Sequence, residues 1–140
     1  MSDDVLQASF RGASLDRIEQ GEGIAKLSCT LSCGERITIH LEGVMLIRSQ
    51  GERGTKRDRN FISGVHIARG REVRGLARAA FAPHGGTDQP WLKSVAKRAL
   101  LGQLCFFRLT PRIGTAVASL CGKIVILPTE EKALVAEKAA

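Results

Sequence analysis

A period of two in hydrophobicity constrains the fold of this chain more than any other sequence feature. In residues 24–31 every second side chain from Leu27 onward is apolar, and in residues 36–43 the same holds from Ile37 onward. That period is typical of strands with one buried face. The short turn sequence SCGE joins them, so the second strand is expected to be an antiparallel partner of the first.

Further segments also have strand character. The run VMLIR is short and continuously apolar, as in a more buried strand, and another strand begins at Phe61. Strand, polar loop and strand in this order predict a long hairpin whose tip is SQGERGTKRDRN. Residues 13–20 fit either a strand or a helical turn. The other segments expected to be strands are residues 5–10, 44–48, 61–69, 105–109, 115–121 and 123–128.

Two central segments change to a helical period. Residues 71–81 carry apolar side chains at the i, i+3, i+4 and i+7 spacing of one helix face. Residues 88–102 have Asp88 as a candidate N-cap, Pro90 in the first turn and Gly102 at the C-terminal end. Both segments are therefore expected to be helices.

The chain as a whole is expected to form a single α+β domain over residues 1–140. With 140 residues it is long enough to bury one core. Residues 129–140 predict a short C-terminal helix, because Thr129 suits the N-cap and acidic side chains occupy its first turn. Runs of strands around two helices favour a mainly antiparallel, twisted sheet or a small β-barrel.

Positive charge is distributed unevenly along the sequence. The formal net charge is +7, made up of −3 in residues 1–47, +6 in residues 48–78, +5 in residues 79–128 and −1 in the remainder. A clustered positive field attracts polyanions over long distances. The sequence therefore predicts an anionic partner, which is nucleic acid (DNA or RNA) or, as the alternative, an acidic protein or anionic lipid. The competing interpretation is that the positive charge only keeps the chain soluble.

The candidate binding residues lie in the polar loop and on the two helices. Arginine presents a planar fork that suits phosphate, and phosphate neutralisation releases counterions. Because the loop has no aromatic side chain before Phe61, we expect backbone contacts and little sequence preference. A solvated loop is the competing interpretation, since Glu52 and Asp58 neutralise part of its charge. The predicted nucleic-acid-binding residues are Arg48, Arg53, Lys56, Arg57, Arg59, Arg71, Arg74, Arg78, Lys93, Lys97 and Arg98.

Catalytic and metal motifs are not found in the sequence. It has no G-x-S-x-G elbow, Walker loop, H-E-x-x-H helix or dinucleotide fingerprint, so no catalytic residue and no cofactor is predicted. A ligand sensor or enzyme with a pocket lined by Cys and His is the least favoured alternative, and a Cys–His pair such as Cys121 with His84 would be its candidate, because such groups assemble in space rather than in sequence. Cys29 and Cys33 lack the tight pair spacing of a zinc knuckle, and no metal site is predicted. Because Cys29, Cys105 and Cys121 fall at apolar strand positions, they are expected to be buried thiols.

One stretch resembles a known family. Residues 31–43, LSCGERITIHLEG, look like the strand–turn–strand of PilZ domains, which bind cyclic dinucleotides. The arginine motif and the following Asp-x-Ser-x-x-Gly motif of that family do not occur in this order, since RGLAR lies downstream and Ile18 stands in place of the serine. The stretch is therefore interpreted as a general β-hairpin pattern, and no cyclic dinucleotide is predicted as a ligand.

The sequence also bears on location and assembly. The stretch MSDDVLQ has no apolar core like that of a secretory signal, and no apolar run reaches the ~20 residues of a bilayer span. A cytoplasmic protein with no membrane partner is expected. Oligomers through exposed sheet edges would fit the protein-interaction alternative.

Overall fold

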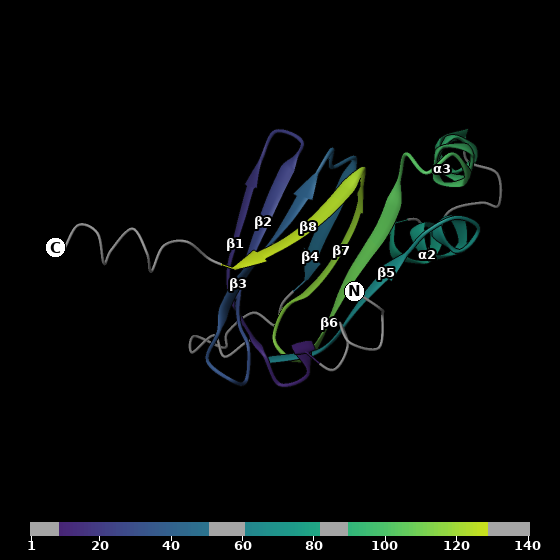
Figure 1. Ribbon diagram of the computed structural model, residues 1–140. Coiled ribbons are helices and arrows are strands. Elements are labelled where there is room, and N and C mark those ends of the chain that lie inside the picture. Colours follow the sequence, from purple (N-terminus) through teal and green to yellow (C-terminus); the bar gives the residue numbers. More distant parts are fainter. Residues whose placement is uncertain (1–8, 51–60, 82–89, 129–140) are drawn as a thin grey trace, which may run out of the picture.

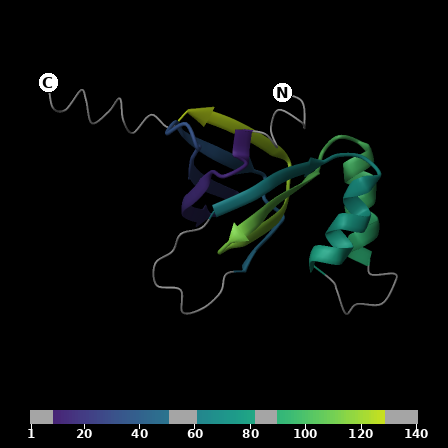
Figure 2. The same ribbon diagram turned by 90° about the horizontal axis from the view of Figure 1, so that it is seen from below.

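The computed structural model describes residues 9–50, 61–81 and 90–128, which form an antiparallel sheet with two helices on one face (Figure 1). Seen along another direction, the two helices make a separate layer beside the strands (Figure 2). The predicted α+β class with an antiparallel sheet is therefore confirmed. The elements are β1 (Ser14–Gly21), β2 (Ile24–Thr30), β3 (Arg36–Glu42), β4 (Leu46–Gln50), β5 (Phe61–Ala68), α2 (Glu72–Phe81), α3 (Pro90–Leu100), β6 (Cys105–Ile113), β7 (Ala116–Cys121) and β8 (Lys123–Pro128).

The sheet joins strands that are distant in the sequence. Its order is β4-β7-β6-β5-β1-β2-β3-β8, with antiparallel pairing throughout. β2 and β3 pair along their full length, from Ile24 opposite Glu42 to Thr30 opposite Arg36. The hairpin predicted from the strongest alternating pattern is thus confirmed.

The long hairpin predicted around the polar loop is wrong. In the sheet β4 pairs with β7, whereas β5 pairs with β6 and β1, so two strands lie between β4 and β5. Alternation identifies a segment as a strand but carries no information about its partner across the sheet. Residues 51–60, which include most of the predicted tip, lie outside the described residues.

Two long strands, each bent in the middle, give the sheet its curl. β3 continues into β4, and β7 continues into β8, and the two bends face each other. The amide of Gly122 donates to the carbonyl oxygens of Glu42 (2.9 Å) and Gly43 (3.1 Å). The amide of Met45 donates to the carbonyl oxygen of Leu120 (2.8 Å). The strand order still ends at β4 on one side and at β8 on the other, so the sheet is not the closed small barrel considered from the sequence.

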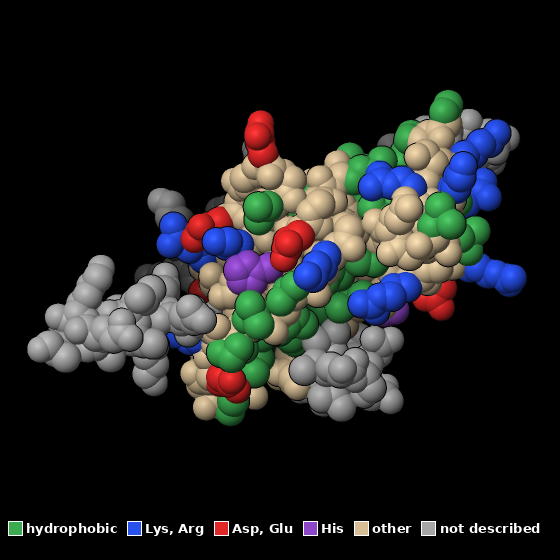
Figure 3. Space-filling view, turned by 45° about the horizontal axis from the view of Figure 1, so that its top comes forward, with side chains coloured by type: hydrophobic (Ala, Val, Ile, Leu, Met, Phe, Trp, Pro, Cys, Tyr) green, Lys and Arg blue, Asp and Glu red, His purple; other side chains and the backbone are tan. Residues whose placement is uncertain are grey.

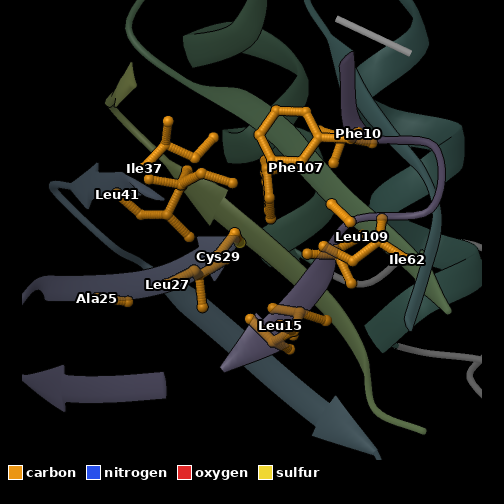
Figure 4. Close-up of a cluster of buried hydrophobic side chains, with 14 of the residues drawn as sticks. Phe10, Leu15, Ala25, Leu27, Cys29, Ile37, Leu41, Ile62, Phe107 and Leu109 are labelled. Atoms are coloured by element: carbon orange, nitrogen blue, oxygen red, sulfur yellow. The ribbon is translucent and has the colours of Figure 1, made fainter. Parts of the chain in front are cut away.

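The first core fills the inner side of the curl. Figure 4 shows its side chains converging from β1, β2, β3, β5 and β6. Of the alternating positions predicted from the sequence, Leu27, Ile39 and Leu41 are fully buried here, whereas Leu31 is partly buried against the same core. Phe10 and Phe107 are its largest members. Burial of each large apolar side chain contributes about 1.5–3 kcal/mol, so this core is the main stabilising element of the sheet.

A second core, the helix-side core, lies between the outer face of the sheet and the two helices. Successive residues of β6 point to opposite faces, so Phe107 enters the curl while Phe106 packs under the helices. Both predicted helices are confirmed, and their apolar faces cover this core. The buried helix residues are Val73, Ala77, Leu92, Val95 and Ala99.

The ends of several elements differ from the sequence expectation. Ser9 and Phe10 are helical, so the strand predicted over residues 5–10 is wrong in its described part. The ambiguous segment 13–20 is a strand, β1. β6 continues through Ile113, which is farther than predicted. The C-terminal helix predicted for residues 129–140 lies outside the described residues.

Candidate functional site

Two arginines flank a single alanine on the outer face of the sheet. Arg48 of β4 and Arg108 of β6 each lie directly opposite Ala118 of the intervening strand β7. Directly opposite residues share a face, with Cβ atoms roughly 4.5–5.5 Å apart. Ala118 packs against the helix-side core, so both arginines emerge on the side of the helices. His66 of β5 lies opposite Arg108 and extends the row.

This row opens into the Arg48–Arg108 groove, which has a volume of about 610 Å³. Ala116 and Ala118 form part of its floor, and the last turn of α2 contributes Ala79 and Ala80. The small side chains leave the space open beneath the guanidinium groups. Among the described residues that line the groove none is acidic. The groove therefore presents positive charge beside an uncharged floor.

The two arginines are held differently. The Nη1 of Arg48 donates a hydrogen bond of 3.1 Å to the carbonyl oxygen of Ala80, near the end of α2. Carbonyl groups in the last turn of a helix lack helical partners, so this bond satisfies one of them and ties β4 to α2. Arg108 is exposed and makes no hydrogen bond or ion pair with another described residue. Its five N–H donors are therefore available to an anion.

Among the described residues, none of the cations predicted on the helices lines this groove. Those that the structure describes as exposed are Arg71, Arg74, Arg78, Lys93 and Lys97. Arg71 precedes α2 and the others lie on α2 or α3. In Figure 3, Lys and Arg side chains gather at the end of the molecule formed by the two helices. These side chains lie opposite the apolar helix faces that cover the helix-side core.

The Arg98 side chain is half-buried, whereas Lys93 and Lys97 of the same helix are exposed. Its Nη1 lies 3.8 Å from the Sδ of Met45, which links α3 to the bend between β3 and β4. Arg98 is therefore less accessible to a partner than Lys97 of the same helix. The loop residues predicted to bind, Arg53, Lys56, Arg57 and Arg59, lie outside the described residues.

Charge is segregated between two parts of the described structure. Residues 9–43 contain four basic and five acidic side chains. The basic half, defined as residues 44–50, 61–81 and 90–128, contains eleven basic side chains and one acidic side chain, Glu72. Most acidic side chains visible in Figure 3 accordingly lie away from the helices. The Arg48–Arg108 groove belongs entirely to the basic half.

Sequence reasoning missed Arg108 and His66. Both occupy outward positions of alternating strands, which is a detectable signal, but such positions are usually only solvated. Their significance depends on register, because Arg108 becomes important only when it stands opposite Ala118. His66 is not a neighbour of His40 of β3 in the sheet, since β1 and β2 separate their strands.

The cysteines follow the expected burial. Cys29, Cys105 and Cys121 are buried, and Cys33 is exposed. Burial raises the pKa of the Cys29 thiol from 9.0 to about 12, with a further contribution from the negative charge of Asp16. Among the described residues no group of three or more His, Cys, Asp or Glu side chains is arranged to hold a metal ion.

Comparison with protein-family models, with curated proteins and with solved structures found no match for this chain. Within the described residues, neither helix is long and apolar enough to cross a membrane.

Proposed function

We propose that the chain binds nucleic acid through its basic half, with backbone phosphates held in the Arg48–Arg108 groove. The observation that carries the proposal is the position of these two arginines on either side of Ala118, above an open groove without acidic lining among the described residues. Two strand spacings separate their backbones by roughly 10 Å, so their long side chains can approach one phosphate or two neighbouring ones.

Electrostatics extends this binding surface beyond the groove. The exposed cations of α2 and α3 belong to the same basic half, and Arg74 and Lys97 are examples on the two helices. The segment 51–60, which contains the four arginine and lysine residues of the polar loop, joins the end of β4 directly to β5. Each phosphate that such groups neutralise releases counterions and makes affinity dependent on salt.

The chemistry of the groove favours the phosphate backbone over the bases. The described part of its lining combines arginine, alanine, threonine, proline and aliphatic side chains, without an aromatic ring on which a base could stack. Trp91 and Phe81 are half-buried and pack against the helix-side core. Phosphate contacts fix orientation without reading sequence, so weak sequence preference follows.

The test is a salt titration of binding to labelled single-stranded and double-stranded DNA and RNA. Arg108→Gln removes one phosphate contact, so affinity should fall about fivefold, which corresponds to ~1 kcal/mol. The slope of log affinity against log salt should decrease in magnitude by about 0.9 for duplex DNA or about 0.7 for a single strand. Arg36→Gln is the matched control, because Arg36 is an exposed strand arginine outside the basic half.

Two outcomes would contradict the proposal. One is no binding by the unaltered chain to any of the four nucleic acids at low salt. The other is an equal loss of affinity in the Arg108→Gln and Arg36→Gln variants, because that result would reflect net charge alone.

Docking of an acidic protein is the second candidate. Leu100 and Leu101 at the end of α3 are 65% and 62% exposed, beside the exposed Lys97, and interfaces often combine apolar and arginine or lysine side chains. Leu101→Ser should then abolish partner capture while leaving nucleic-acid affinity unchanged. If nucleic-acid affinity is negligible and an acidic partner is retained through Leu101, this second function replaces the first.

A further inference from the structure

A small pocket lies where β6 begins and β7 ends, away from the groove. Its volume is about 170 Å³. One thiol, that of Cys105, lines it together with two cationic residues, Arg69 and Lys123. Gly102 and Gly122 also contribute to the wall, and their lack of side chains keeps the pocket open. A nucleophile, positive charge and a small volume are thus combined at one place.

Cys105 has a second thiol beside it. Cys105 and Cys121 lie directly opposite each other on β6 and β7, and their Sγ atoms are 3.9 Å apart. Directly opposite residues of antiparallel strands have Cα atoms roughly 4.5–5.5 Å apart, within the range of about 4.4–6.8 Å found in disulfides. Both cysteines are free thiols in this structure. Side-chain rotation would bring the sulfur atoms to bonding distance without a change in strand pairing.

The two thiols differ in acidity. The S–H of Cys121 can donate a hydrogen bond to the Cys105 thiolate, and this lowers the pKa of Cys105 from 9.0 to about 7 against the opposing effect of burial. The positive charge of Arg69 lowers it further. The pKa of Cys121 is raised, first because its proton is shared with Cys105 and then by burial. When protonated, Cys105 instead donates to the carbonyl oxygen of Cys121, 3.3 Å away.

These features give the two cysteines different roles. Cys105 lines the pocket and has the role of the nucleophile. Cys121 retains its proton and does not line the pocket, but its Sγ lies 3.9 Å from that of Cys105. Thiolate character and access decide which cysteine is oxidised first. Cys29 has neither property, because it is buried in the first core and its pKa is raised to about 12.

We propose that Cys105 and Cys121 form a dithiol site for small hydroperoxides, which converts to an intramolecular disulfide. The sulfur of the Cys105 thiolate attacks one peroxide oxygen, the O–O bond breaks, and the departing hydroxide or alkoxide takes a proton from solvent. Cys105 is then a sulfenic acid. The sulfur of Cys121 attacks the Cys105 sulfur, the S–O bond breaks, and the hydroxyl leaves as water with the proton of Cys121. One peroxide is reduced for each disulfide formed.

The pocket explains why the oxidant would be small. A volume of about 170 Å³ admits hydrogen peroxide or a short alkyl hydroperoxide but is too narrow for a bulky peptide disulfide. Arg69 and Lys123 can stabilise the negative charge that develops on the leaving oxygen. The site needs no nucleic acid, so its test is independent of the function proposed above.

The experiment treats the full chain with hydrogen peroxide, alkylates it under denaturing conditions and digests it with trypsin. Cleavage after Arg98, Arg108, Arg112 and Lys123 places the two cysteines on separate peptides, 99–108 and 113–123. We expect mass spectrometry to find these two peptides joined by a disulfide that dithiothreitol reverses. Peptide 27–36, which contains Cys29 and Cys33, should remain doubly alkylated and serves as the internal control.

Three variants assign the roles. In Cys121→Ser, peroxide should leave a sulfenic acid on Cys105 that dimedone traps, whereas Cys105→Ser should leave Cys121 reduced. Arg69→Gln changes an exposed residue and keeps both thiols, and it should slow disulfide formation several-fold. This third variant keeps the proposal testable if either serine variant fails to fold.

Three results would overturn the proposal. Full alkylation of peptides 99–108 and 113–123 after peroxide treatment would remove the site. Disulfide formation at the same rate in Arg69→Gln would remove the role of the basic pocket. Reaction with oxidised glutathione as fast as with peroxide would contradict the preference for a small oxidant.

Discussion

Arg48 and Arg108 lie opposite the same residue, Ala118, although their strands β4 and β6 do not touch. β7 passes between them and contributes only an alanine at that point. The two guanidinium groups therefore share one stretch of sheet surface with almost no side chain separating them. This relationship defines the Arg48–Arg108 groove and the prediction that follows from it.

A carboxylate placed between these arginines should compete with phosphate for them. We expect Ala118→Glu to reduce nucleic-acid affinity more than tenfold, because its charge satisfies both guanidinium groups internally. Ala118→Gln, which adds nearly the same volume without charge, should reduce affinity by much less. Binding titrations of the two variants at one salt concentration make the comparison, and equal losses would show that bulk rather than charge is responsible.

The two phenylalanines of β6 should stabilise different parts of the molecule. Phe106 packs under the helices and Phe107 packs inside the curl, and both are fully buried. Replacement of either by Ala should cost about 3–5 kcal/mol. Hydrogen exchange should increase mainly in α2 and α3 for Phe106→Ala and mainly in β1, β2 and β3 for Phe107→Ala. The same exchange pattern in both variants would contradict a division into two cores.

The bend between β3 and β4 should tolerate only glycine at residue 43. Gly43 has a φ of 63°, and a Cβ there would lie 3.4 Å from the backbone nitrogen of Gly122. Gly43→Ala should therefore destabilise the fold by about 1–2 kcal/mol. The matched variant Gly75→Ala lies in α2 with nothing within 4 Å of its Cβ, and it should stabilise by about 0.5–1 kcal/mol. Urea unfolding measures both, and a Gly43→Ala variant as stable as the unaltered chain would contradict the role of the bend.

The buried thiol of Cys29 should make the fold sensitive to alkali. Its pKa is raised from 9.0 to about 12, so the folded state retains a proton that the unfolded state releases near pH 9.0. The stability from this group is complete below pH 9.0 and is lost as pH rises toward 12, on the order of 1 kcal/mol per pH unit. Cys29→Val should reduce this dependence in unfolding experiments, while Cys33→Ser at the exposed cysteine should not. An unchanged slope in Cys29→Val would contradict the assignment.

Local patterns in the sequence predicted both helices and most of the strands that the structure describes. The alternation around Leu27 and Ile39 identified β2 and β3, their pairing and their buried faces, because adjacent strands joined by a short turn have few alternatives. The spacing of apolar residues from Val73 identified the inner face of α2. The burial of Cys105 and Cys121 followed from their apolar positions in two other strand segments.

The partners of the other strands were decided only by the tertiary structure. The bends at Gly43 and Gly122 carry β4 away from β5 and place it beside β7, so the predicted hairpin does not form. Apolar periodicity records which face of a strand is buried but not which strand lies next to it. For that reason the sequence indicated Arg48 as one candidate among eleven and did not indicate Arg108. The sequence showed where positive charge is concentrated. The positions of Arg48 and Arg108 on either side of Ala118, and of Cys105 opposite Cys121, depend on long-range register.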